Sequence, residues 1–152
     1  MMKKPTLIDV GRVAGVSAIT VSRALREPER VSDSMRQKVF EAVKKLGYVP
    51  DSAASTLASN RSTVIGMLVP SFSNNVFSQV LAGAYDAIEG TKFSIQIGNT
   101  RYSALKEEEM ARKFLSQKPA GMIITGVDQT EATRNLFRST DCPVVQVMDL
   151  TD

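Results

Sequence analysis

Two short helical patterns joined by a glycine-containing turn most constrain the fold of this chain. Thr6 is a suitable N-cap for a first helix, and Gly15 allows the left-handed backbone that commonly ends one. Ser17 then caps a second helix, with Val16 and Val21 at the two positions of a hydrophobic staple. Two helices joined by so short a turn form a helix-turn-helix unit.

The second predicted helix has two chemically different faces. Its inner face is apolar and comprises Val21, Ala24 and Leu25. Its opposite face comprises Ala18, Ile19, Ser22 and Arg23. Ile19 beside Arg23 is unusual for a face that meets only water. It suits DNA base edges, because arginine bonds guanine bidentately and small apolar groups contact thymine methyls. The hydroxyls of Thr20, Ser22 and Ser32 suit phosphate oxygens.

A third helical pattern, from Ser32 to Gly47, completes a small domain. Its apolar stripe comprises Met35, Val39, Val43 and Leu46, with Phe40 beside it. The apolar face of the first helix comprises Leu7, Val10, Val13 and Ala14. Three short helices give a compact core but leave no room for a ligand cavity. We therefore interpret this segment as a scaffold for the exposed second helix.

Charge is unevenly distributed along the chain. Residues 1–63 carry 11 Lys and Arg against 6 Asp and Glu, whereas residues 64–152 carry 8 against 10. A basic N-terminal part on a mildly acidic body points to a polyanion partner for the first part only. A merely well-solvated positive surface is the alternative that charge alone leaves open.

Residues 51–63 have the composition of a linker. Pro50 and the Ser, Asn and Arg residues that follow mark a break in structure. Asp51 can cap a short helix through Ala53, Ala54 and Leu57, but so short a helix is not stable alone. Composition by itself favours a disordered tether.

From Val64 onward the pattern changes to short apolar, β-branched runs: "VIGMLVP", "FSIQIG", "GMIITG" and "PVVQVMD". These alternate with helical stretches near residues 76–90, 105–117 and 130–139. Such an alternation predicts a parallel, doubly wound α/β sheet. Ligands bind these sheets beyond the carboxyl ends of the strands, here "PSFSNNVF", "NTRY", "TGVDQ" and "MDLTD".

Several residue types and motifs are missing from the sequence. There is no histidine, which excludes catalysis built on histidine and His/Cys zinc sites. The one cysteine, Cys142, precedes an apolar strand and is expected to pack there. Neither a G-x-G-x-x-G after a strand nor a G-x-x-x-x-G-K-[ST] occurs. The acidic run "KEEEMARK" is interpreted as the solvated start of a surface helix. We therefore expect neither an enzyme nor a bound metal or cofactor.

The sequence also bears on cellular location. No apolar run approaches the roughly 18 residues of a membrane span, and the N-terminus lacks the apolar stretch of a signal peptide. A single cysteine suits a reducing compartment. These features predict a cytoplasmic protein without membrane contact.

Together these residues resemble a known family. The stretch "TLIDVGRVAGVSAITVSRALREPERVSDSMRQKVFEAVKKLGYVPDSAASTLAS" is similar to the DNA-binding headpiece of the lactose-repressor (LacI/GalR) family, a match over residues 5–58. The stretches "IGMLVPSFSNNVFSQVLAGAYDAIE" and "GMIITG…CPVVQVMDL" resemble its effector-binding lobe of periplasmic-binding-protein type. Within the family, "LVPSFSNNVFS" and "MDLTD" look most like the gluconate-operon repressors.

The resemblance implies roles for the matching residues. Major-groove base contacts would come from Ala18, Ile19 and Arg23, and DNA-backbone contacts from Thr6, Ser17, Thr20, Ser22, Ser32 and Tyr48. The linker would become a hinge helix on the operator, with Leu57 wedged into a base step and Ala54 near the minor groove. Effector contacts would come from Ser71, Phe72, Asn75, Phe77 and Asp149. Asp51 and Ser55 depart from the family's usual Asn and basic residue, which implies weaker minor-groove contacts.

The resemblance also implies an organisation. Residues 1–50 would form a three-helix DNA-binding domain, residues 51–63 a hinge, and residues 64–152 the N-terminal part of an α/β effector-binding domain. Because family members are more than twice as long and the sequence stops after the fourth predicted strand, the lobe is expected to be incomplete. A fragment, a truncated gene product and a partial record all fit.

The function implied is that of a transcriptional regulator, a repressor of a sugar or sugar-acid (such as gluconate) utilisation operon. It would bind a pseudo-palindromic operator in double-stranded DNA as a homodimer. A small sugar or sugar-acid effector would release the full-length protein from DNA. Two alternatives stay open: a transport-type small-molecule binding protein, which shares the lobe fold, and a truncated regulator without function.

Overall fold

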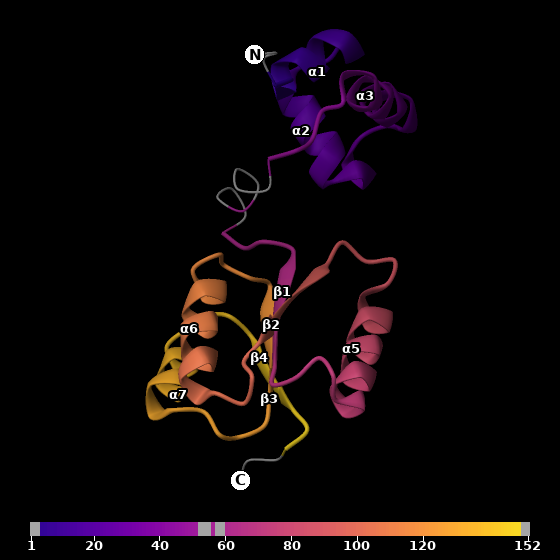
Figure 1. Ribbon diagram of the computed structural model, residues 1–152. Coiled ribbons are helices and arrows are strands. Elements are labelled where there is room, and N and C mark those ends of the chain that lie inside the picture. Colours follow the sequence, from indigo (N-terminus) through magenta and orange to yellow (C-terminus); the bar gives the residue numbers. More distant parts are fainter. Residues whose placement is uncertain (1–3, 52–55, 57–59, 150–152) are drawn as a thin grey trace. The chain divides into compact units, whose positions relative to one another are not determined.

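The computed structural model describes residues 4–51, 56 and 60–149. The chain divides after Asp51 into two compact units, which we call the headpiece (residues 1–51) and the body (residues 52–152) (Figure 1). The headpiece comprises α1 (Leu7–Ala14), α2 (Ala18–Arg26), a 3-10 turn η1 (Pro28–Arg30) and α3 (Asp33–Leu46). The three predicted helices are confirmed, whereas the turn η1 was not expected from the sequence.

Local sequence signals set the helix ends of the headpiece. Thr6 and Asp9 form a reciprocal capping box at the start of α1. Gly15 and Gly47 end α1 and α3 with φ of 69° and 58°, a left-handed conformation that costs glycine least. Gly11 is buried inside α1, because that helix packs closely against the turn before α2.

The headpiece core contains most of the apolar residues that the sequence pattern predicts, with Leu7, Ala14, Leu25, Val43 and Leu46 packed around its buried centre. Its fully or almost fully buried side chains are Val10, Val21, Ala24, Val39 and Ala42. Three residues expected in it are substantially exposed: Met35 (37%), Val13 (44%) and Phe40 (46%). For these three the prediction was wrong. Ala42, which was not predicted, is buried with Val39 on the inner face of α3.

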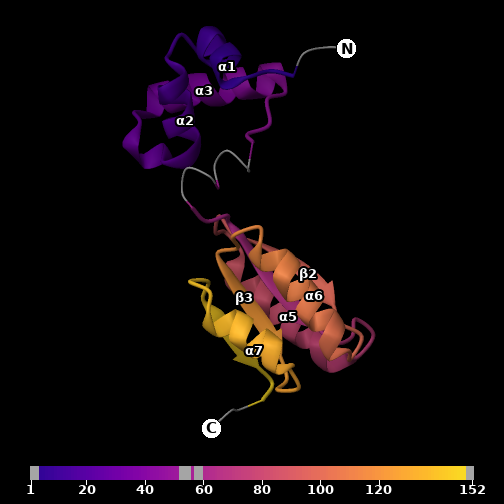
Figure 2. The same cartoon turned by 90° about the vertical axis from the view of Figure 1, so that its left-hand side faces the viewer.

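The body is a parallel α/β sheet, as predicted. Its elements are β1 (Val64–Val69), α5 (Asn75–Ile88), β2 (Ser94–Asn99), α6 (Ala104–Leu115), β3 (Gly121–Thr125), α7 (Glu131–Arg138) and β4 (Val144–Val147). The strands lie in the order β2-β1-β3-β4, and every neighbouring pair is parallel. Helix α5 covers one face of the sheet, and α6 and α7 cover the other (Figures 1 and 2).

The central strand β1 is buried on both faces. Met67 and Val69 pack beneath α5 together with Phe77. Leu68 points to the other face, where it packs in the cluster of Ala111 and Phe114 from α6. This alternation explains why the strand is a continuous apolar run in the sequence. Cys142 packs at the margin of the second cluster, which agrees with the packing role expected for it.

Candidate functional site

Helix α2 is held in the headpiece by its cap and its inner face. The Ser17 hydroxyl accepts a hydrogen bond from the Thr20 amide at 3.1 Å, which fixes where the helix begins. Val21 and Ala24 are fully buried in the headpiece core, as the sequence predicts. These two residues lie three positions apart on one helix face, so their burial fixes the rotation of the helix. The opposite face is therefore turned to solvent.

The outer face of α2 combines a cation with apolar surface. Ile19 is 73% exposed, and Arg23 is exposed four residues further along the same face. Arg23 forms no ion pair with any described residue. Ala18 and Ser22 lie partly buried beside them. This surface suits a partner that offers both hydrogen-bond acceptors and methyl groups, as the DNA major groove does.

Several hydroxyls expected at the DNA backbone already have partners inside the headpiece. The Thr6 hydroxyl donates to the Asp9 carboxylate at 2.7 Å, and the Ser17 and Thr20 hydroxyls lie 2.9 Å apart. A hydroxyl has one proton to donate, so the Thr6 hydroxyl has to release Asp9 before it can donate to a phosphate, whereas the Ser17–Thr20 bond uses the proton of only one of its two hydroxyls. Ser32 is different, because it is exposed and its side chain makes no capping bond to the described helix α3. The contacts of these residues with DNA stay predictions.

Tyr48 lies at the end of the headpiece. Its ring packs against the headpiece core, and its amide donates to the Val43 carbonyl at 3.0 Å. Burial, and then the nearby Asp51 carboxylate, raise the pKa of the Tyr48 phenol, so the phenol stays protonated as a donor. The two predicted minor-groove residues, Ala54 and Leu57, lie outside the described residues.

The carboxyl ends of the four parallel strands meet at one edge of the sheet, which we call the ligand edge. The chain segments at this edge are residues 70–74, 100–103, 126–130 and 148–149. The central strands β1 and β3 are neighbours, but α5 and α7, which follow them, lie on opposite faces. Ligands of doubly wound sheets bind in the crevice at such a switch point.

The predicted effector residues fall into two groups. Four lie on or beside the ligand edge: Ser71, Phe72, Asn75 and Asp149. Phe72 is 52% exposed, and the Ser71 hydroxyl accepts a hydrogen bond from the Ser73 amide at 3.2 Å. Phe77, on α5, is only 8% exposed and packs against Met67 and Val69 of β1. Its ring therefore holds α5 against the sheet, and a contact with a ligand stays a prediction.

Known proteins match this chain over almost its whole length. Residues 6–51 match the family described as bacterial regulatory proteins, lacI family. The HTH-type transcriptional regulator GntR of Pseudomonas aeruginosa is 40% identical over 147 residues, which are 97% of this chain and 43% of that protein. GntR of Escherichia coli (strain K12) is 36% identical, over 97% of this chain and 44% of that protein. The chain belongs to the LacI family.

Solved structures of the LacI family share both units. A transcriptional regulator from Silicibacter pomeroyi aligns with a TM-score of 0.83 at 43% identity, over 95% of this chain and 44% of that one. The lac repressor dimer bound to operator aligns with a TM-score of 0.76 at 28% identity, over the same shares. The fold is therefore a helical helix-turn-helix headpiece with part of a periplasmic-binding-type α/β lobe. The chain spans less than half the length of the curated relatives that it matches.

A polar cluster at the ligand edge of this LacI-family chain was missed by the sequence reasoning. Gln129 is 7% exposed, and its side-chain amide donates to the Gly126 carbonyl at 2.9 Å. Gln146 donates to the same carbonyl at 2.6 Å. One carboxylate oxygen of Glu107 is buried without a hydrogen-bond partner among the described residues. The sequence shows polar residues at these strand ends, but no local signal shows which of them turn inward.

The charge on Glu107 is disfavoured where it lies. Burial raises the pKa of its carboxyl group, a hydrogen bond with Gln129 offsets part of that rise, and the Asp128 carboxylate adds to it. The backbone of this edge is also unusual. Arg101, Tyr102 and Met148 have φ of 52°, 56° and 71°. Residues other than glycine rarely adopt this left-handed backbone conformation, and the residues that do adopt it concentrate at ligand sites.

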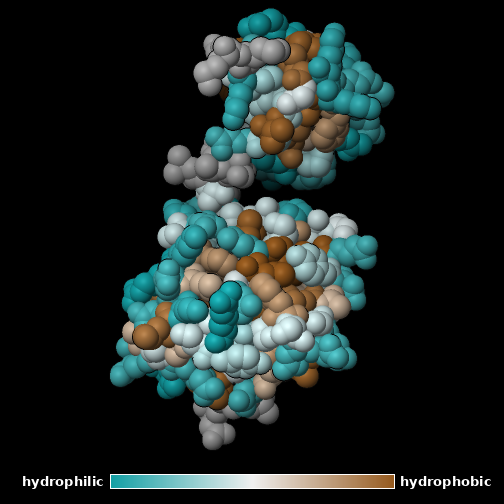
Figure 3. All heavy atoms as spheres, viewed as in Figure 1, coloured by the Kyte–Doolittle hydropathy of each residue, from teal (hydrophilic) through white to brown (hydrophobic). Residues whose placement is uncertain are grey.

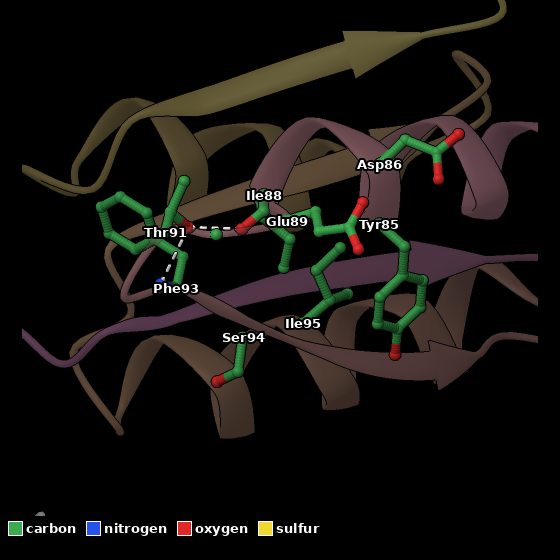
Figure 4. A pocket seen from close by; sticks show the side chains of 9 residues that line it. Tyr85, Asp86, Ile88, Glu89, Thr91, Phe93, Ser94 and Ile95 are labelled. Atoms are coloured by element: carbon green, nitrogen blue, oxygen red, sulfur yellow. Dashed lines mark hydrogen bonds between the residues drawn. The ribbon is translucent and has the colours of Figure 1, made fainter.

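A second surface lies at the outer edge of strand β2. The end of α5 and the start of β2 line a shallow hollow with Tyr85 and Phe93 at its margin (Figure 4). These two rings are 47% and 37% exposed. Apolar side chains gather on this face of the body (Figure 3). Among the described residues, β2 has a neighbouring strand on one side only.

Two kinds of feature are absent from the described residues. No described helix has the length and apolar character needed to cross a membrane. No group of three or more potential ligand side chains in the described ranges is arranged to hold a metal ion.

Proposed function

We propose that this protein is a sequence-specific DNA-binding regulator of transcription and that α2 is its recognition helix. The observation that carries the proposal is the outer face of α2, where Ile19 and Arg23 are exposed on a helix whose rotation is fixed by its buried side. Base contacts then come from Ala18, Ile19 and Arg23, and backbone contacts from the hydroxyls of the headpiece and Tyr48. The relatives' names, HTH-type transcriptional regulators, support a regulator rather than an enzyme.

The charge distribution supports the same proposal. Residues 1–63 carry 11 Lys and Arg against 6 Asp and Glu. Cations that neutralise phosphates release counterions, so binding to DNA of any sequence weakens as salt rises. The contacts of α2 with base edges add a preference for one sequence to this general attraction. Such a protein works in the cytoplasm, where bacterial DNA lies.

Selection from a library of DNA duplexes with randomised central positions tests this proposal. The selected duplex should bind more tightly than a scrambled duplex of the same composition, and both affinities should fall with salt. Arg23→Ala should remove the preference at one base pair. Lys38→Ala, which makes the same charge change on the exposed surface of α3, should lower both affinities equally or neither. If the wild-type chain enriches no sequence, the proposal is wrong.

A homodimer is the second part of the proposal. A two-fold symmetric protein matches a pseudo-palindromic operator, and the lac repressor, a structural relative, is described as a dimer bound to operator. The outer edge of β2 offers a strand edge with exposed Tyr85 and Phe93, which a second copy would cover. Sedimentation of the chain on a full palindrome and on a half-site should give complexes with two copies and one copy of the chain.

A small sugar or sugar-acid effector at the ligand edge is the third part. Ser71, Asn75 and Asp149 supply polar groups there, and two curated relatives carry the name GntR. In this scheme residues 1–50 bind DNA, residues 51–63 form the hinge and residues 64–152 contribute to the effector site of the full-length protein. An effector that binds the DNA-free state more tightly releases the operator. Calorimetric titration with gluconate, and with glucose as the uncharged control, tests this part.

A further inference from the structure

The segment that leads into β1 is bonded to the amino ends of the other three strands. Toward β2, the Thr63 carbonyl accepts a hydrogen bond from the Ser94 amide at 3.0 Å. Toward β3, the Ser62 amide donates to the Lys118 carbonyl at 2.8 Å. Ser62 also fixes its own segment, since its hydroxyl accepts from the Val64 amide at 3.2 Å. The chain is thus held on both sides before β1 begins.

Two long side chains add further hydrogen bonds between this segment and the other strands. The Lys118 ammonium group donates to Oδ1 of Asn60 at 2.6 Å. The Arg61 guanidinium group donates to the Asp141 carbonyl, just before β4, at 2.9 Å. Both bonds join residues far apart in the sequence, across 58 and 80 positions. We call residues 60–62 together with Lys118 and Asp141 the latch.

The backbone of the latch is also held in a costly conformation. Asn60 and Lys118 have φ of 58° and 52°, in the left-handed region that residues other than glycine rarely adopt. Such a conformation persists where the surrounding contacts determine it. Here the two residues that adopt it are bonded directly to each other. The latch is therefore a specific arrangement and differs from a loop lying loosely on a surface.

We propose that the latch positions the headpiece for DNA binding, with Lys118 and Arg61 as its positioning residues. This inference rests on the proposed function. The headpiece ends at Asp51 and the latch begins at Asn60, so the eight residues 52–59 span at most about 30 Å. In the proposed homodimer, one bound headpiece makes the binding of the second headpiece intramolecular. Fixing the body end of each tether confines that second headpiece and raises its effective concentration at the other half-site. Releasing the latch lets the tether start from Thr63, which stays bonded to Ser94, and spreads the headpiece over a larger volume.

The test removes the hydrogen bond between Lys118 and Asn60, once by changing the donor and once by changing the acceptor. Lys118→Met removes the donor and keeps the apolar stem, whereas Asn60→Gly removes the acceptor and keeps the left-handed backbone accessible. Each should weaken binding to the selected duplex up to roughly twofold, because effective concentration falls roughly as the −3/2 power of tether length and the tether grows from residues 52–59 to residues 52–62. Binding to the scrambled duplex should stay unchanged. The double variant should lose no more than either single one, because both remove the same bond.

Two controls separate position from charge and from stability. Lys113→Met makes the same charge change on the exposed surface of α6 and should leave both affinities unchanged. Lys118→Arg keeps a long cationic donor at this position, so this variant should keep most of the specific affinity that Lys118→Met loses. The thermal midpoint of the body should be similar in all these variants, while amide exchange at Ser62 should accelerate in Lys118→Met and Asn60→Gly.

Each other outcome decides against the proposal. Faster exchange at Ser62 with unchanged specific affinity would show that the latch exists but positions nothing. Unchanged exchange at Ser62 would show that the side-chain bond does not hold the segment. Loss of affinity in Lys118→Met but not in Asn60→Gly would assign the effect to the lysine charge. A wild-type chain that selects no DNA sequence would refute the proposed function and the positioning role with it, while the exchange measurement would still show whether residues 60–62 are held.

Discussion

Gly11 lies where the helix-turn-helix packing leaves the least room. A Cβ added there would lie 2.7 Å from the Val16 carbonyl oxygen and 3.4 Å from the Ala18 amide nitrogen. Both are backbone atoms, and the Val16 amide also donates to the Gly11 carbonyl at 2.9 Å. No side chain can rotate away to make space. Gly11→Ala therefore has to push α1 away from the turn, and with it the start of α2.

The size of the effect follows from two opposing contributions. Alanine in place of glycine within a helix gains about 1 kcal/mol of helix propensity. Overpacking a well-packed interior costs about 1–3 kcal/mol, and contact with rigid backbone places this site near the upper value. The expected net destabilisation of the headpiece is about 2 kcal/mol. A small domain shifts its midpoint by roughly 4–8 °C per kcal/mol, so the headpiece should melt roughly 8–16 °C lower.

Thermal unfolding followed by circular dichroism, with amide exchange to assign the transition to the headpiece or the body, measures this effect. Gly83→Ala in α5 is the matched control, because nothing lies within 4 Å of a Cβ added there. That substitution should stabilise the body by about 0.4–1 kcal/mol. A headpiece that is as stable with alanine at position 11 as with glycine would refute the close approach of α1 to the turn.

Three further substitutions probe the cap, the recognition face and the ligand edge. Thr6→Ala removes the capping box and should cost the headpiece about 1 kcal/mol in the same unfolding measurement, whereas Thr6→Ser should cost little. Arg23→Ala should cost about 1–3 kcal/mol of binding to the selected duplex in a titration, and equal weakening on every sequence would make Arg23 a phosphate contact instead. The raised pKa of Glu107 means that the folded body binds this proton more tightly than the unfolded chain, so this group's contribution to stability is lost as pH rises above its ordinary value of 4.5. Glu107→Gln should remove that loss in thermal melts between pH 4 and pH 7. Hydrogen bonds from Arg112 and then Thr130 lower the pKa of Glu108, so the contribution of this group to stability is lost toward acid pH, and Glu108→Gln should remove that loss.

The parts of the fold that sequence predicts well depend on neighbours in the chain. Thr6 caps α1 through Asp9, three residues away, and Gly15 ends it through its own backbone freedom. The central strands β1 and β3 are predictable for a related reason, since a strand buried on both faces has to be an apolar run. In each case the cause of the structure lies within a few residues of its effect.

Contacts between elements are predicted less well. Met35 shares the inward stripe of α3 with Val39, yet it stays 37% exposed, because which members of a stripe are covered depends on the helices that pack against it. From the sequence alone, Gly11 is a residue of low helix propensity. Its close approach to Val16 arises only when the turn folds back on α1. The inward orientation of the Gln129 side chain depends in the same way on the folded ligand edge, where it donates to the Gly126 carbonyl.

Separate cores in the two units make it possible to distinguish loss of fold from loss of position. Among the described residues, the buried headpiece side chains cluster with headpiece neighbours, and the two body clusters consist of body residues. Gly11→Ala should therefore lower headpiece stability and weaken binding to every DNA sequence, with the body unchanged. Lys118→Met should weaken binding to the selected sequence alone, with headpiece stability unchanged. If both variants weakened binding to all sequences equally, the latch would act through the stability of the headpiece, and a positioning role could not be maintained.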